Sequence, residues 1–417
     1  MIECKLGDIL KIQQGFAFKS SNYVTKSNVA LVTLGNFTNN NDFQFNKEKT
    51  TFYGVDYPRE YNLNEGDLII PMTEQVIGLF GNTAFVPKID KIQFVLNQRV
   101  GKIIIDENKV DKKFIHYLLS TELVRSQLEY RASGTKQRNI SSDNIYDVTV
   151  YLPSLSVQKK IGNLLYTLEL KINNNNKINS NLEEMMKTLY QRWFLEFEFP
   201  NEEGKPYKLS GGKMVWNELL KRNIPEKWDS KNIMDFITWE GTSQPPKSCF
   251  IYEYKEGYIR FIQNRDYEDS SHMTYIPENK ALGKCSRYDI LMDKYGDAGR
   301  TRFGLEGAYN VALSKINVKD IFYREYIRSV LSSESTYNYL HNSSMASTRA
   351  SLNENNVSYI NIVVPDKNII SQYNKFANNY IETKLQIYDE NKRLTELRDY
   401  LLPMLMNGQI NVDDVEI

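Results

Sequence analysis

The chain has 417 residues, 41% of them hydrophobic, and its 52 basic residues balance 52 acidic ones. This length predicts about two to four domains with real cores, and the hydrophobic content excludes a disordered chain. The zero net charge excludes a uniformly basic nucleic-acid-binding protein, so any DNA-binding surface must be a local patch. Because the sequence lacks a long apolar run and a signal-peptide pattern, and its three cysteines lie far apart, we expect a soluble cytoplasmic protein without membrane contact.

The first globular segment, placed at residues 1–153, mixes short strands with helices. The apolar run at 68–70 predicts a strand, and residues 114–130 have a helical pattern. Alternating apolar residues at 148–152, stopped by Pro153, predict a half-buried strand.

A long helical segment follows at residues 154–198, with apolar residues at heptad spacing. Lys171 and Asn175 interrupt the pattern as polar exceptions. The predicted a and d positions are Ile161, Leu164, Leu168, Ile178, Leu182, Met185 and Leu189. Residues 199–230 contain prolines and glycines among many charges and predict a linker into the second half.

The chain then repeats this order once. Residues 344–365 follow the apolar pattern of residues 132–153 at an offset of 212. A single repeat of this length excludes a solenoid and indicates two homologous halves in tandem. We place the second globular domain at 231–365, a second long helix at 366–410 and a tail at 411–417. The seam of that helix is predicted to contain Tyr373, Phe376, Tyr380, Ile387, Leu394, Leu397, Leu401 and Met404.

The predicted fold is therefore α+β, with two globular mixed α/β domains and two long helices that pair antiparallel as a coiled coil. The two halves are expected to be related by a pseudo-twofold axis. Polar residues at 173–176 and 383–384 fall near the middle of each seam. They indicate either a device that sets the register or a site where a partner docks.

The sequence lacks the motifs of common enzymes. It contains no phosphate-binding loop, nucleophile elbow or dinucleotide-binding glycine motif, and its three histidines lack metal-ligand spacing. A nuclease built on Pro365-Asp366 would need a later Glu-x-Lys, and we do not expect one. We therefore predict no catalytic residue, no metal site and no cofactor in this chain.

Two similar domains on a rigid spacer match the geometry of DNA half-sites at a fixed separation. The loop at 132–142, counted together with the preceding Arg131, carries three basic residues among amide and hydroxyl side chains, and its Gly134 allows the backbone to approach a phosphate. Arg and Lys can pair with guanine, and Asn and Gln with adenine. The predicted DNA-binding residues of the first half are Lys19, Ser20, Asn22, Gln75, Lys136, Gln137, Arg138 and Asn139. Those of the second half are Asn264, Arg265, Lys294, Tyr295, Arg300, Arg302, Ser347, Thr348 and Arg349.

Several short motifs, and their order along nearly the whole chain, resemble the specificity subunit of Type I restriction–modification systems. Two departures are Ala346, where that loop motif has glycine, and the degenerate opening motif at 233–236. The motifs that carry the resemblance are Leu6-Gly7-Asp8-Ile9, Gly134-Thr135 leading to Ile140, Trp193-Phe194-x-x-Phe197, Ile224-Pro225-Glu226-Lys227-Trp228 and Leu401-Leu402-Pro403-x-Leu405-x-x-Gly408.

The resemblance implies that each globular domain is a target recognition domain, which reads one half of a bipartite site in double-stranded DNA. The helices would set the spacing and dock two methyltransferase (M) subunits, which bind S-adenosylmethionine and flip an adenine out for methylation. Restriction (R) subunits using ATP and Mg would complete a complex for defence against phage. The chain itself would do no chemistry.

Two alternatives remain open. The chain could be the specificity subunit of a system in which methylase and nuclease are fused in one polypeptide, a difference that neighbouring genes would reveal. It could also be a coiled-coil scaffold that binds only protein, in which case no complex would depend on DNA. Each globular half is close to neutral, so a DNA-binding role would require a basic partner to provide much of the backbone contact.

Overall fold

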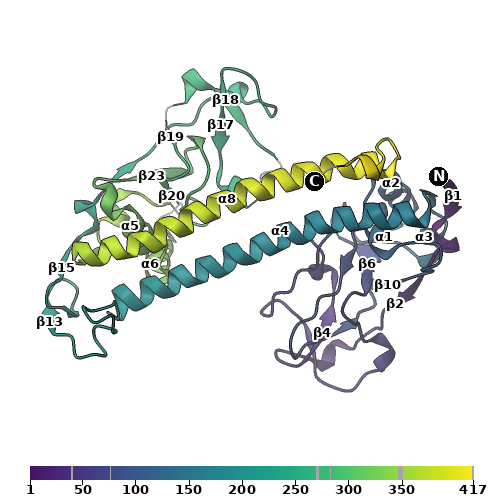
Figure 1. The fold of residues 1–417 in the computed structure, drawn as a ribbon, viewed down its shortest axis with the longest axis horizontal. Helices are drawn as coiled ribbons and strands as arrows, with labels where there is room; N and C mark the ends of the chain where they lie inside the picture. The colour runs from purple at the N-terminus through teal and green to yellow at the C-terminus, as the bar shows by residue number, and fades with distance from the viewer. Residues whose placement is uncertain (39–40, 76, 269–271, 282, 346–350, 416–417) are drawn as a thin grey trace. The chain divides into compact units, whose positions relative to one another are not determined.

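The computed structural model describes residues 1–38, 41–75, 77–268, 272–281, 283–345 and 351–415. The chain forms two compact units, which consist of Met1–Asn175 with Glu390–Ile417 (unit 1) and Asn176–Asp389 (unit 2). Two long helices, α4 (Leu155–Tyr190) and α8 (Lys367–Met406), each contribute one part to both units (Figure 1). A π-helical turn at Gln191–Leu195 continues α4. The name head 1 is used for the part of unit 1 that precedes α4. The name head 2 is used for the part of unit 2 that begins with β15 and ends before α8.

Head 1 is built on a four-stranded antiparallel sheet with the strand order β2-β10-β6-β8. A second sheet, β3-β5-β4-β9, contains one parallel pair, between β4 and β9. The strands of head 1 are β1 (Ile2–Lys5), β2 (Leu10–Gln14), β3 (Tyr23–Val24), β4 (Val29–Val32), β5 (Phe52–Tyr53), β6 (Leu68–Pro71), β7 (Thr73–Glu74), β8 (Ala84–Phe85), β9 (Gln93–Leu96), β10 (Val100–Ile105), β11 (Arg138–Asn139) and β12 (Thr149–Leu152). Its helices are α1 (Lys112–Leu119), α2 (Glu122–Arg131) and α3 (Ser142–Tyr146).

Head 2 has the same plan. Its antiparallel sheet has the order β16-β23-β20-β21, and its second sheet, β18-β17-β22-β19, contains the parallel pair β17 and β22. The strands are β15 (Asp229–Asn232), β16 (Ile237–Glu240), β17 (Tyr258–Ile262), β18 (Tyr275–Pro277), β19 (Lys284–Cys285), β20 (Ile290–Asp293), β21 (Thr301–Arg302), β22 (Gly307–Tyr309), β23 (Leu313–Val318) and β24 (Asn361–Val364). The helices are α5 (Arg324–Ser332), α6 (Glu334–Met345) and α7 (Glu354–Val357).

The internal repeat and the α+β fold are confirmed. The first residues of α5, α6, α7 and α8 follow those of α1, α2, α3 and α4 at the constant offset that the sequence repeat predicts. The terminal strand pair β1–β12 of head 1 returns as β15–β24 in head 2. The offset is larger near the start of each half, between β2 and β16, because the loops between the strands differ in length.

The predicted linker also contains regular structure. The strands β13 (Met214–Asn217) and β14 (Arg222–Pro225) form a two-stranded antiparallel sheet, and β15 begins at Asp229. The proline- and glycine-rich pattern indicated the turns correctly but did not predict a hairpin. Neither long helix, nor any other helix in the described ranges, has an apolar stretch long enough to cross a membrane.

Half of the predicted heptad seam of α4 is correct. Ile161 and Leu168 are buried as predicted, and Asn175, a polar exception in the same frame, is buried as well. Ile178 and Met185, by contrast, are 46% and 65% exposed. The positions predicted at Leu164, Ile178 and Met185 are in fact occupied by the residue that follows each of them in the chain. This second set of seam residues is buried or half-buried and consists of Gln158, Leu165, Ile172, Asn179, Met186 and Trp193.

The same shift occurs in α8. Tyr373, Ile387 and Leu401 are buried, whereas Phe376 is 56% exposed. The second set of seam residues in α8 is also buried or half-buried and consists of Ile370, Ala377, Lys384, Asn391, Arg398 and Leu405. Each of them follows its counterpart in α4 at the offset of the repeat. The sequence prediction was wrong for this set because the helices also face the heads, which rotates the buried stripe relative to a strict two-helix seam.

Within each unit the two long helices lie against each other through polar contacts. In unit 1 the Asn175 side chain donates hydrogen bonds to Glu390 at 2.7 Å and to Asn391 at 2.8 Å, and Lys171 forms an ion pair with Glu390 at 3.2 Å. These contacts join the middle of α4 to the middle of α8.

The direction of the pairing is visible in unit 2. Lys384 lies 3.5 Å from Glu183, and the ring centroids of Trp193 and Tyr373 lie 6.1 Å apart. A later residue of the α4 segment, Trp193, thus faces an earlier residue of α8, Tyr373, while the earlier Glu183 faces the later Lys384. The helices run antiparallel, as predicted.

Both long helices complete the hydrophobic core of each unit. In unit 1, Ile161 and Leu165 of α4 and Leu401 of α8 share one core with Phe114 and Leu118 of head 1. In unit 2, Phe194 lies with its ring centroid 4.8 Å from that of Tyr326 in head 2 and 4.9 Å from that of Tyr373 in α8. A head without the helices would therefore expose a large part of its core.

We predict that Phe194→Ala lowers the free energy of unfolding by about 3–5 kcal/mol, because the side chain is fully buried among aromatic rings. Leu209→Ala is the control, since Leu209 is 80% exposed, and it should change stability by less than about 0.5 kcal/mol. Urea denaturation followed by tryptophan fluorescence measures both. Equal stabilities of the two variants would contradict this account of the core.

Candidate DNA interface

The predicted DNA-contacting loop of head 1 folds as a tight turn between α2 and α3. The backbone groups of Ser133 and Asn139 exchange two hydrogen bonds, of 2.9 and 2.8 Å, which close the turn. Gly134 adopts a φ of +111°, and a Cβ there would lie 2.2 Å from the carbonyl oxygen of Gln137. The glycine predicted to approach phosphate is thus required by the turn itself.

The structure brings two separately predicted segments of head 1 together. β11 pairs with β7, so that Arg138 lies opposite Glu74 and Asn139 opposite Thr73. Gln75 follows β7 directly and is exposed, as are Lys136 and Asn139. Gln137 is half-buried and its amide donates to Asn139 Oδ1 at 3.2 Å. This strand pair gathers exposed amide and ammonium groups on one edge of head 1.

Arg138 differs from these exposed residues because its guanidinium is occupied inside the head. Nη1 lies 2.9 Å from Glu74 Oε1, and Nη2 donates a 2.7 Å hydrogen bond to the carbonyl of Glu129 at the end of α2. The Arg138 side chain is 20% exposed, and that of Glu74 is 1% exposed. A base contact through the guanidinium fork would require these donors to be free.

Lys19, Ser20 and Asn22 lie on a separate 3-10 turn of head 1, Ser20–Asn22. Lys19 and Ser20 are exposed. The side-chain amide of Asn22 donates to the Tyr53 hydroxyl at 3.1 Å, and the backbone carbonyl of Asn22 accepts a hydrogen bond from the backbone N–H of Gly54. These hydrogen bonds anchor the turn to β5, not to the β7–β11 pair.

In head 2 the predicted segments at 264–265 and 294–302 also come together. Asn264 and Arg265 lie on a 3-10 turn, Asn264–Tyr267, which follows β17. Arg302 of β21 donates to Glu268 at 2.7 Å and to Asp293 at 3.2 and 3.1 Å. Like Arg138, Arg302 is thus held by buried and neighbouring carboxylates, and its side chain is 11% exposed. Arg265 and Arg300 are exposed.

The loop that contains Lys294 and Tyr295 meets the start of the repeated segment. The backbone N–H of Leu352 donates to the carbonyl of Lys294 at 3.0 Å, as Ile140 donates to Met72 in head 1. Lys294 is half-buried, and burial lowers the pKa of its ammonium group; Tyr295 is exposed. Ser347, Thr348 and Arg349 lie outside the described residues.

Sequence reasoning missed Asp293, and it placed Glu74 in a candidate DNA-contacting segment without predicting its ion pair; these two carboxylates organise the two surfaces. Each stands at the end of a buried apolar stretch, Leu-Ile-Ile-Pro-Met-Thr before Glu74 and Ile-Leu-Met before Asp293. An acid that directly continues a buried strand is the signal that could have identified them, because an unpaired carboxylate is costly to bury.

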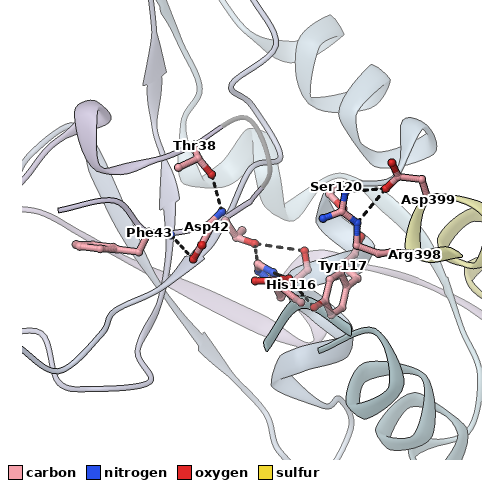
Figure 2. Close-up of polar contacts among 10 residues, drawn as sticks. Thr38, Asp42, Phe43, His116, Tyr117, Ser120, Arg398 and Asp399 are labelled. Carbon is pink, nitrogen blue, oxygen red and sulfur yellow. Dashed lines mark hydrogen bonds and ion pairs between the residues drawn. The ribbon is translucent and has the colours of Figure 1, made fainter. Parts of the chain in front are cut away.

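A buried polar cluster also connects head 1 to α4. The Tyr117 hydroxyl donates a 2.6 Å hydrogen bond to Glu169 of α4, whose carboxylate lies 3.5 Å from His116 Nε2. Burial, reinforced by the charge of Glu169, raises the pKa of Tyr117. Figure 2 shows Asp42 on the His116 side of the cluster and Arg398 of α8 on the Tyr117 side. Burial raises the pKa of the Asp42 carboxyl as well.

No cluster of three or more His, Cys, Asp or Glu side chains within the described ranges could hold a metal ion. Contrary to expectation, Glu-x-Lys does follow Pro365-Asp366, at Glu382-Thr383-Lys384 and again at Glu390-Asn391-Lys392, where Glu390 pairs with Lys171 and accepts from Asn175. Asp366 directly precedes α8, and Glu382 lies about 24 Å further along the helix axis. Glu382 instead accepts a hydrogen bond from Tyr288, and Lys384 pairs with Glu183, so these residues do not form a nuclease site.

The pH dependence of stability tests the buried carboxylate of head 2. Burial raises the pKa of Asp293 to about 6, and the Arg302 guanidinium offsets this only in part. Because the folded state holds this proton more tightly than the unfolded chain, the contribution of Asp293 to stability falls as the pH rises from about 4 to about 6. Asp293→Asn removes the titration. The difference in free energy of unfolding, variant minus native, should therefore increase by up to about 3 kcal/mol between pH 4 and pH 7.

Glu268→Gln is the matched control, since it removes the other carboxylate on Arg302. The Glu268 side chain is 66% exposed, so its loss should cost no more than about 1 kcal/mol at either pH. Thermal unfolding at pH 4 and pH 7 gives both comparisons. An Asp293→Asn difference that does not change with pH would exclude a strained buried charge at this position.

Comparison with known proteins assigns this architecture. Residues 2–184 match the family described as the Type I restriction modification DNA specificity domain. The MjaIX specificity subunit of a Type I restriction enzyme from Methanocaldococcus jannaschii is 23% identical over 327 residues, 75% of this chain and 72% of that subunit. The HindI specificity subunit from Haemophilus influenzae is 24% identical, over 98% of this chain and 99% of that subunit.

A solved structure shows the same fold. The crystal structure of a Type I restriction–modification S subunit from M. genitalium superposes with a TM-score of 0.63 at 13% identity, covering 97% of this chain and 95% of that one. The predicted resemblance is confirmed: residues 2–184 match the DNA specificity domain of Type I restriction–modification systems, and the chain is similar over almost its whole length to a specificity subunit of a Type I restriction enzyme.

Proposed function

We propose that this chain is the DNA-reading subunit of a Type I restriction–modification complex, in which head 1 and head 2 each recognise one half of a bipartite target. The observation that carries the proposal is the repeat of a head and a long helix at a constant offset, in a chain whose first half matches a DNA specificity domain. Two similar heads with different loops suit a target made of two different half-sites.

The polar groups on the strand-end turns are suited to base recognition. Gln75, Lys136 and Asn139 in head 1, and Arg265 and Arg300 in head 2, are exposed and carry the donors and acceptors that read base edges. They stand on turns that short strand pairs and buried carboxylates hold in place. Rigid presentation of a few such groups favours specific contacts over general affinity.

The long helices provide a surface for the methyltransferase subunits. Several large apolar side chains of α4 and α8 point away from the seam and are exposed, which is typical of protein interfaces. These residues are Leu170, Ile178, Met185 and Tyr400. Because the whole chain has no net charge, we propose that these subunits supply much of the contact with the DNA backbone.

In this role S-adenosylmethionine binds to the methyltransferase subunits, and ATP and Mg bind to the restriction subunits. A system with a fused methylase and nuclease would use the same DNA-reading chain, and the neighbouring genes distinguish the two. A scaffold that binds only protein is less favoured, because residues 2–184 match a DNA specificity domain.

Exchange of a head tests independent half-site recognition. Replacing residues 1–152 with the head of another specificity subunit should change one half of the methylated motif and leave the other half unchanged, because α8 and head 2 retain their contacts. Sequencing of methylated genomic DNA at single-molecule level measures the motif. A change in both halves, or in neither, would contradict the assignment of one half-site to each head.

Lengthening the helices tests whether they set the spacing between half-sites. Seven residues inserted after Asn175 and seven after Asp389 keep the heptad frame, and these points face each other because Asn175 bonds to Glu390. The insertion adds about 10 Å to each helix, so the half-sites should separate by up to about three base pairs.

Two inserted residues in each helix are the control, since they rotate the seam by about 200° and should impair assembly. Methylome mapping reads the spacing in the seven-residue variant. An assembled variant that still methylates the original spacing would mean that the helices do not determine it.

A further inference from the structure

Glu74 joins three segments of head 1 through one buried side chain. Its Oε2 accepts the backbone N–H groups of Leu79 at 2.9 Å and Phe80 at 3.2 Å, which folds the loop after β7 back on itself. Its Oε1 pairs with Arg138 Nη1 at 2.9 Å. Through Nη2, Arg138 then reaches the carbonyl of Glu129 at the end of α2.

The exposed side chains of the candidate interface are attached directly to this buried pair. Gln75 is the next residue after Glu74, and Lys136 stands two residues before Arg138, from which it is separated by the half-buried Gln137. The Arg138 guanidinium also lies 5.6 Å from the centroid of the Phe80 ring, which covers one of its faces. A movement of either charged partner would therefore displace both exposed turns together.

We propose that Glu74 and Arg138 are positioning residues for sequence recognition by head 1, and that neither touches the DNA. The inference rests on the proposed function and gives Arg138 a different role from the predicted contact with a base or a phosphate. Lys136 and Gln75 carry the contacts, and the buried pair fixes the distance between them. A loss of either partner leaves a buried charge without its counterion, so the damage from one substitution is relieved when both partners become neutral.

The test uses the full chain assembled with its methyltransferase subunits and measures DNA affinity against salt concentration. Arg138→Leu and Glu74→Gln should each weaken binding of the cognate site by about tenfold, the size of losing one base contact. In a chain that already carries Lys136→Ala, Arg138→Leu and Glu74→Gln should leave the slope of log affinity against log salt unchanged, since neither substitution then removes a phosphate contact. The double variant Glu74→Gln/Arg138→Leu should bind more tightly than Arg138→Leu alone.

Lys136→Ala is the matched control on the same turn. It removes an exposed cation, and a phosphate contact there would lower the salt slope by about one. Arg138→Lys is the milder variant if Arg138→Leu does not fold, because the ammonium group still pairs with Glu74 but cannot also bond to Glu129. It should weaken binding, and in the Lys136→Ala background it should leave the salt slope unchanged. Recognition of the half-site read by head 2 should remain native in every variant, which also shows that the chain is folded.

Two results would overturn the inference. If Arg138→Leu or Arg138→Lys lowers the salt slope by about one in a chain that already carries Lys136→Ala, or relaxes a single base position without rescue by Glu74→Gln, then Arg138 contacts DNA directly. If both single variants bind like the native complex, the pair does not position the interface. A native complex that does not distinguish the cognate site from other DNA would instead refute the proposed function.

Discussion

The packing of the two long helices into both heads is the constraint on which the rest of the structure depends. Unit 1 is discontinuous in sequence because it contains the end of α8, and unit 2 contains the end of α4 together with the start of α8. Leu401 and Leu405 return from the far end of the chain to join the core that includes Phe114. Folding of head 1 is therefore tied to residues close to the C-terminus, and loss of either helix would expose apolar surface in both units.

Polar residues determine the register of this helix pair, while the apolar residues provide most of its stability. Asn175 is 2% exposed and its amide bonds to Glu390 and Asn391, an arrangement that would be lost if one helix slid by a turn. The Lys384–Glu183 pair serves the same purpose in unit 2. Of the two interpretations of the polar residues in the seam, these contacts favour the register device.

The candidate DNA interface is supported by groups that do not belong to it. Glu74 and Asp293 are buried carboxylates, and each pairs with an arginine that the sequence placed among the predicted DNA-binding residues. A cationic side chain in a surface turn is therefore not by itself a DNA contact. Which cations are free depends on whether a carboxylate from another strand lies within reach. This divides the predicted residues into exposed groups such as Lys136 and groups already paired with a buried carboxylate, such as Arg138.

The sequence by itself determined the order of the elements, the repeat of a head and a long helix, and the antiparallel pairing of the helices. These features follow from apolar periodicity, which is a local property of the chain. One set of seam positions, which includes Ile161 and Leu168, was also correct. The hairpin at 214–225 and the second seam set were not predicted, because a strand pair and a helix rotation depend on what the segment packs against.

Only the tertiary structure decided which candidate residues share a surface and which are already occupied. β11 and β7 are separated in sequence by several strands and two helices, so no local pattern could place Arg138 opposite Glu74. The same holds for Arg302 and Glu268, which approach each other only because β21 and the turn after β17 meet in head 2. The physical reason is that an ion pair depends on distance in space, and distance in space between separate elements is set by the packing of the whole unit.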